Sequence, residues 1–174
     1  MRSVSGSMSQ ERYSILFSSA TGNTKKLAEA LRQALPAEAC DYFGTQQEEV
    51  PPSELLYIGF WTDKGNADEA TLALLQKLRG RKLFLFGTAG FGGSEAYFGQ
   101  VLARVKQSID PSNTVVGAYM CQGKMPLSVR ERYVRMQAQP DHPANLDALI
   151  ENFDRALSHP DAEDLNNLRK LVLA

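Results

Sequence analysis

The sequence predicts an α/β fold, a doubly wound three-layer sandwich built on a five-stranded parallel sheet. Short apolar segments bounded by turn residues alternate with segments of helical periodicity between residues 13 and 120. This alternation is typical of βαβ units. Right-handed crossovers then favour the strand order 2-1-3-4-5, numbered along the chain, and ligands are expected where the strand order reverses. The alternation stops after residue 120, so extra C-terminal helices should follow the sheet.

Five segments have the short, apolar character of strands: residues 13–17, 39–43, 55–60, 82–86 and 114–120. The third of these is almost wholly apolar, which is typical of a central strand covered on both faces. Helices are expected over residues 25–35, 68–78, 94–108, 128–137, 145–157 and 161–172. The first helix carries Leu27, Leu31 and Leu35 at a spacing of four, which places them on one buried face.

The C-terminal helices lead to three further expectations. Ser128 and Glu131 have the spacing of a capping box at a helix start. The apolar stripe of residues 145–157 should cover one face of the sheet. Asp161 follows His159-Pro160 and is placed to cap the last helix.

Length and composition favour one domain over residues 11–174. Residues 1–10 are small and polar; we expect a disordered extension or a cloning remnant there, with Met8 as a candidate natural start. The net charge of −1 gives no basic surface for nucleic acid, and no apolar run approaches the ~20 residues of a membrane span. Two cysteines and no signal-peptide core indicate a reducing, cytoplasmic setting. We expect a monomer or a weak dimer.

The turn between the first strand and the first helix is rich in hydroxyl groups. It consists of Ser18, Ser19, Ala20, Thr21, Gly22, Asn23 and Thr24. A helix N-terminus offers free N–H groups and partial positive charge, so this turn suits a phosphate. It lacks the lysine of a nucleotide-hydrolase P-loop and the glycine pattern of a dinucleotide fold. An ordinary N-cap, in which a hydroxyl satisfies helix N–H groups, remains the alternative.

Two further loops should reach the same sheet edge. The loop after the third strand holds the single tryptophan, and an exposed tryptophan favours a flat partner. Glycines in the loop after the fourth strand would let the backbone approach a ligand. Burial of both loop aromatics as caps over the sheet remains possible.

The pattern Ser19-x-Thr21-Gly22-x-Thr24 resembles the phosphate turn of flavodoxins, which hold the phosphate of flavin mononucleotide (FMN). This resemblance implies FMN as the cofactor and clamping of its ring by the two loops. On the matching positions these are Trp61, Thr62, Asp63, Lys64 and Gly65, and Thr88, Ala89, Gly90, Phe91 and Gly92. Residues 59–65 and 121–126 are similar to a bacterial subgroup associated with bilirubin reductase (BilS-like).

The resemblance implies a small electron-transfer flavoprotein that passes single electrons to a redox partner protein, such as a reductase. Two alternatives remain open: an NAD(P)H or quinone oxidoreductase on the same fold, and a flavin-free module that only binds proteins. Cys121 at the end of the fifth strand lacks the arginine of a phosphatase loop, which favours a structural role. His142 and His159 lack ligand-type neighbours in sequence, so we expect no metal site and no catalytic residue.

Overall fold

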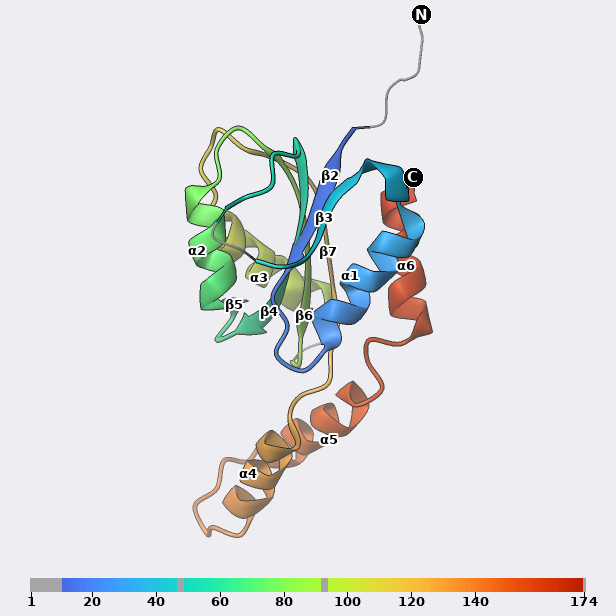
Figure 1. Ribbon diagram of the computed structural model, residues 1–174. Coiled ribbons are helices and arrows are strands. Elements are labelled where there is room, and N and C mark those ends of the chain that lie inside the picture. Colours follow the sequence, from blue (N-terminus) through green and yellow to red (C-terminus); the bar gives the residue numbers. More distant parts are fainter. Residues whose placement is uncertain (1–10, 47–48, 92–93, 174) are drawn as a thin grey trace, which may run out of the picture.

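The computed structural model describes residues 11–46, 49–91 and 94–173 and shows an open sheet with helices on both faces (Figure 1). The expectation for residues 1–10 lies outside this range. The main sheet consists of β2 (Tyr13–Phe17), β3 (Cys40–Thr45), β4 (Leu55–Asp63), β6 (Lys82–Ala89) and β7 (Thr114–Gln122). These strands are parallel and have the order β3-β2-β4-β6-β7, which confirms the predicted 2-1-3-4-5 arrangement.

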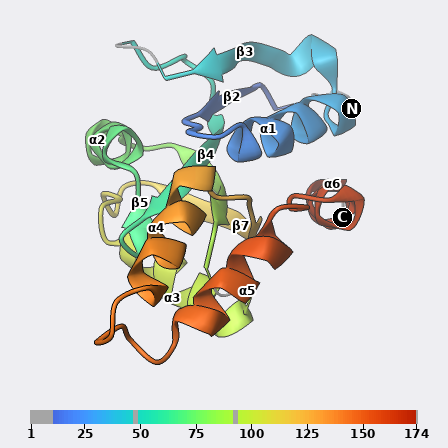
Figure 2. The same ribbon diagram turned by 90° about the horizontal axis from the view of Figure 1, so that it is seen from below.

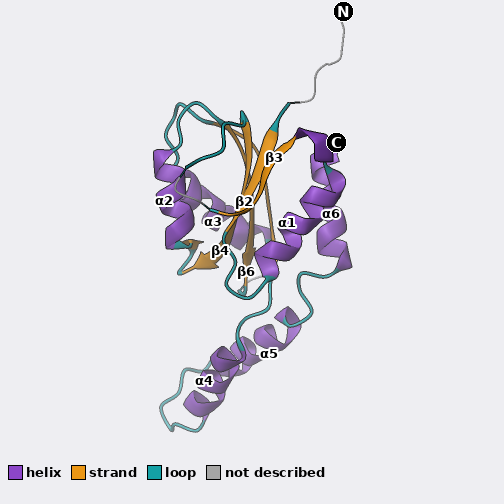
Figure 3. Cartoon of the chain, in the orientation of Figure 1, coloured by secondary structure: helices purple, strands orange, loops and turns teal. Residues whose placement is uncertain are grey.

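Helices cover the two faces in pairs (Figure 3). They are α1 (Asn23–Ala34) and α6 (Ala162–Leu173) on one face, and α2 (Glu69–Lys77) and α3 (Glu95–Lys106) on the other. A 3-10 turn, η1 (Ala37–Ala39), precedes β3, and a two-residue strand, β5 (Asn66–Ala67), pairs antiparallel with the end of β4. The predicted three-layer sandwich is therefore confirmed.

Alternate side chains of each strand point to opposite faces, so one sheet supports two cores. In β2, Leu16 contributes to the core under α2 and α3, whereas Ile15 and Phe17 contribute to the core under α1 and α6. On the second face, Leu27 of α1 and Leu168 of α6 are both fully buried. Burial on both sides explains why the central strands are almost continuously apolar.

The last two helices before α6 form an arm. Helices α4 (Leu127–Gln137) and α5 (Leu146–Ala156) make a hairpin that projects from the carboxyl edge of the sheet (Figures 1 and 2). The prediction that residues 145–157 cover the sheet is therefore wrong. The apolar stripe of α5 packs against α4, with Phe153 and Tyr133 buried, while α6 takes the place beside α1.

Two predicted helix caps have different outcomes. Helix α4 begins after Pro126, and no side chain of the described residues caps it, so the predicted Ser128–Glu131 capping box is wrong. The predicted cap at Asp161 is confirmed, because its Oδ1 accepts the Asp164 N–H at 2.9 Å. Asp164 Oδ2 accepts the Asp161 N–H in return, also at 2.9 Å.

Over the described ranges, no helix has both the length and the apolar character needed to cross a membrane.

Replacing Leu168 with alanine should test whether α6 stabilises the sheet. Its side chain is fully buried against the α1 face, so the cavity left behind should lower the free energy of unfolding by about 2–5 kcal/mol. The matched control is Leu171→Ala on the same helix, where the side chain is 46% exposed and the loss should stay within about 0.5 kcal/mol. Urea unfolding followed by circular dichroism measures both; equal losses would contradict this placement of α6.

Candidate functional site

The turn between β2 and α1 presents an open helix N-terminus. Gly22 occupies the N-cap position with φ 87°, a left-handed conformation that glycine adopts without strain, and no side chain of the described residues caps the helix. Ser19 Oγ accepts the Gly22 N–H at 3.1 Å and so folds the turn on itself. The hydroxyl groups of the turn therefore do not act as an ordinary N-cap, and the first N–H groups of α1 remain available.

Thr24 fixes the start of α1 over the ends of two strands. Its Oγ1 donates to the Phe60 carbonyl at 3.0 Å and lies 3.2 Å from Thr88 Oγ1. The Thr24 side chain is fully buried, and Thr88 is 2% exposed. The hydroxyl of Thr24 is thus used within the fold, and its contribution is to position the helix.

Residues 61–65 differ from the expected loop. Trp61 lies within β4, which continues to Asp63 and turns back into β5. The turn residues Lys64 and Gly65 have φ 53° and 79°, as a tight two-residue hairpin requires. Arg104 of α3 donates to the Gly65 carbonyl at 3.3 Å and fastens the hairpin tip to that helix.

The segment that follows β7 closes the site from a third side. The Lys124 carbonyl accepts from Asn23 Nδ2 at 2.7 Å and from Thr21 Oγ1 at 3.3 Å. The Gly123 N–H donates to the Ala89 carbonyl at 3.0 Å. Residues more than a hundred positions apart in sequence thus form one wall of the site.

The arm is attached to the loop after β6. The Gly90 carbonyl accepts from Asn152 Nδ2 of α5 at 2.9 Å and from Gln122 Nε2 at 3.1 Å. A Cβ atom added at Gly90 would collide with Met125, so the loop and the segment after β7 are in close contact. Helix α5 therefore helps to hold the predicted glycine loop in place.

These elements enclose a cavity of about 290 Å³ at the carboxyl edge of the sheet, near the lower end of the range for ligand sites. Its lining is Ala20, Thr21, Asn23, Trp61, Thr62, Thr88, Gly90, Lys124, Met125 and Pro126. All but the last three were predicted from the sequence. The three that were not predicted as cofactor-binding residues lie in the stretch 121–126, which the sequence had marked only as similar to the BilS-like subgroup.

The other predicted residues do not line the cavity. They are Ser18, Ser19, Gly22, Thr24, Asp63, Lys64, Gly65, Ala89 and Phe91. Phe91 is 42% exposed, which excludes a buried cap over the sheet. Gly92 lies outside the described residues.

Two buried atoms in the cavity wall have no hydrogen-bond partner among the described residues: Asn23 Oδ1 and Thr62 Oγ1. Leaving a buried polar group unpaired costs about 1–3 kcal/mol, so these two atoms are positioned to form hydrogen bonds with a molecule in the cavity. Lys124 adds a positive charge to the same lining. Together with the open end of α1, these groups fit a ligand that has both an anionic group and a polar edge.

Cys121 is unsuited to nucleophilic chemistry. Burial, reinforced by the nearby carboxylates of Asp164 and Asp161, raises the pKa of the Cys121 thiol far above its ordinary value. A thiol that stays protonated is a poor nucleophile. This agrees with the structural role expected from the sequence.

The fold brings together a possible ligand set that sequence spacing did not predict. Atoms of His159, Asp161 and Asp164 lie within 4.8 Å of one another. His159 Nδ1 is 2.6 Å from Asp164 Oδ2, whose carboxylate also accepts the Asp161 N–H. These contacts belong to the cap of α6 and account for the cluster without a metal.

The sheet order, the open helix end at the switch point and the cavity beside it define a class: doubly wound α/β proteins, whose ligand sites lie at this edge of the sheet. The family model described as "Flavodoxin domain" matches residues 14–173. The chain therefore belongs to the flavodoxin family.

Named relatives support this assignment. A flavodoxin-like domain-containing protein BilS from Clostridium symbiosum is 37% identical, over 94% of this chain and 95% of its own length. One from Clostridioides difficile is 28% identical, over 87% and 88%. The predicted BilS-like resemblance is thus confirmed. Oxidised Flavodoxin 2 from Bacillus cereus matches with a TM-score of 0.54 and 15% identity, over 93% of this chain and 95% of that one, which shows the shared fold.

Thiol titration with Ellman's reagent should distinguish the two cysteines. At pH 8 the partly exposed Cys40 should react in the native protein, while Cys121 should react only after unfolding, because burial keeps its thiol protonated. In a Cys40→Ser variant, native protein should show no rapid reaction and urea-unfolded protein should show one thiol. Rapid reaction of that variant before unfolding would contradict the buried placement.

Proposed function

We propose that this protein binds FMN and passes single electrons to and from a redox partner protein in the cytoplasm. The observation that carries the proposal is the uncapped N-terminus of α1 opening beside the cavity. A helix end of this kind binds phosphate through its free N–H groups and its dipole. The cavity next to it would then take the flat ring that the phosphate tail brings with it.

The residues of the cavity divide into two groups in this proposal. Ala20, Thr21 and Asn23 would hold the phosphate and its chain, and Trp61 and Thr62 would hold the ring. The unpaired Asn23 Oδ1 and Thr62 Oγ1 would receive the donors they lack. When bound, FMN supplies a ring that exchanges electrons one at a time, a chemistry that the side chains lack.

The cavity lining favours an electron carrier over a stand-alone enzyme. Among its described residues there is no histidine, tyrosine, cysteine or carboxylic acid, and Lys124 is the one side chain of a kind that transfers protons in catalysis. Electron exchange needs only a held and partly shielded ring. The membership of the flavodoxin family agrees with this reading.

Flavin titration should test the phosphate site directly. We expect the fluorescence of FMN to be quenched when FMN binds. FMN should bind at least about tenfold more tightly than riboflavin, a difference of about 1.4 kcal/mol, because only FMN has a phosphate that can interact with the N-terminus of α1. Equal affinities for FMN and riboflavin would contradict a phosphate site at the N-terminus of α1. No uptake of either flavin would favour the flavin-free module, and steady NADPH oxidation by the pure protein would favour the oxidoreductase.

A pair of threonine-to-valine variants should separate a ligand contact from a structural one. Thr62→Val removes an unpaired hydroxyl, so the flavin-free protein should keep its stability while FMN affinity falls about tenfold. Thr24→Val removes the buried hydroxyl that donates to the Phe60 carbonyl and should lower the free energy of unfolding by about 1–3 kcal/mol. Urea unfolding and FMN titration measure both quantities. Unchanged affinity in Thr62→Val would exclude that hydroxyl as a flavin contact.

A further inference from the structure

The arm has an exposed helix face that the flavin site does not use. We propose that the outward face of α4 docks an acidic redox protein, one whose contact surface combines carboxylates with an apolar centre. This inference rests on the proposed role as an electron carrier and specifies the chemistry of the partner.

The face has an apolar centre. Leu127 and Val134 are seven residues apart, two helical turns on the same side of α4, and they are 64% and 44% exposed. They line a shallow hollow of about 410 Å³ together with Arg130, Glu131 and Arg135. The opposite side of α4 packs on α5, so this second apolar stripe has no partner among the described elements.

The charge on this face is positive and partly unpaired. Helix α4 carries Arg130, Arg132 and Arg135 against a single carboxylate, that of Glu131. Arg130 pairs with Asp154 of α5 at 2.9 Å. Arg132 and Arg135 have no ion-pair partner within the described ranges, so their charge is available to another molecule. Arg135 lines the hollow, whereas Arg132 lies outside it on an exposed flank of the same helix.

The carboxylates of α5 are already engaged. Asp154 pairs with Arg130, Glu151 pairs with Arg155 at 2.9 Å, and Asp147 accepts from Gln137. Arginines therefore offset two of the three carboxylates on α5, while Asp147 keeps its negative charge because the Gln137 amide is neutral. The two unpaired arginines of α4 outnumber its one carboxylate, that of Glu131, and so favour an acidic partner over a basic one.

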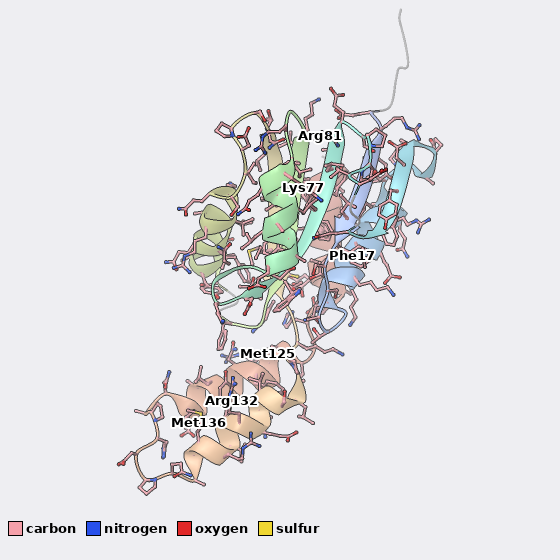
Figure 4. The ribbon with its side chains drawn as sticks, turned by 60° about the vertical axis from the view of Figure 1, so that its left-hand side comes forward. Phe17, Lys77, Arg81, Met125, Arg132 and Met136 are labelled. Carbon is pink, nitrogen blue, oxygen red and sulfur yellow. The ribbon has the colours of Figure 1, made fainter. Side chains whose placement is uncertain are left out.

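The face is also continuous with the cavity. The lining residues Lys124, Met125 and Pro126 lead directly into α4. In Figure 4 Met125 lies where the arm joins the sheet, and Arg132 and Met136 lie further along the arm. A partner bound to α4 would thus rest beside the cavity mouth, and electron transfer becomes steeply faster as two redox centres approach.

Nuclear magnetic resonance can map the docking face without using electron transfer. The probe is oxidised plant-type [2Fe–2S] ferredoxin, a small acidic redox protein, added to the isotope-labelled FMN-loaded protein at low salt. We expect amide shifts concentrated in residues 124–137, lost at high salt because screening weakens the contact. Basic cytochrome c should not shift the α4 amides. Ferredoxin shifts spread evenly over the surface, or centred on α5, would overturn the proposal.

Charge reversal then tests the two unpaired arginines. In stopped-flow mixing, one electron passes from the reduced ferredoxin cluster to the bound flavin, and the bimolecular rate constant is measured. Arg132→Glu with Arg135→Glu should lower that constant on the order of tenfold at low salt, since charges at a docking rim act mainly on association. The matched control is Lys106→Glu with Lys170→Glu, two exposed lysines outside the arm, which changes net charge equally and should stay within about twofold.

These outcomes remain separable from failure of the proposed function. If the protein takes up no FMN, the electron carrier role fails, while the ferredoxin shifts at α4 can still be measured on the flavin-free protein. If FMN binds but both double variants slow the reaction equally, the α4 docking face is overturned. Circular dichroism of each variant confirms that the arm keeps its helices.

Discussion

The buried hydroxyl of Thr24 is the interaction on which the site depends. By donating to the Phe60 carbonyl at the end of β4 and meeting Thr88 at the end of β6, it fixes where α1 begins. The helix dipole and the free N–H groups of the first turn are useful only if they face the carboxyl ends of the strands. One short polar side chain thus aligns the helix with the two strands that border the cavity.

Most of the fold could be predicted from the sequence, because the spacing of apolar residues distinguishes the strands from the helices. The sheet order followed from alternation and crossover handedness. The prediction for residues 145–157 was wrong. An apolar stripe shows that one side of a helix is buried, but it does not show which element covers that side. The stripe containing Phe153 packs on α4, and Leu168 of α6 performs the role expected of α5.

The site was predicted where side chains or glycines signal it, and missed where the backbone builds it. The turn at residues 18–24 and Trp61 stand out in the sequence. The Lys124 carbonyl, which Thr21 and Asn23 share, belongs to the main chain and leaves no trace in residue type. The extension of β4 through Trp61 was also hidden, because it depends on a hairpin turn at Lys64 and Gly65 that the sequence had suggested only as a loop.

The hydrogen bond from Asn152 to the Gly90 carbonyl connects the arm directly to the wall of the cavity. Thermodynamic reciprocity then applies: if filling the cavity shifts this loop and changes the affinity of the arm for another protein, that protein must change the affinity of the cavity by the same factor. The amide of Asn152 is thus one contact through which the arm and the cavity could influence each other.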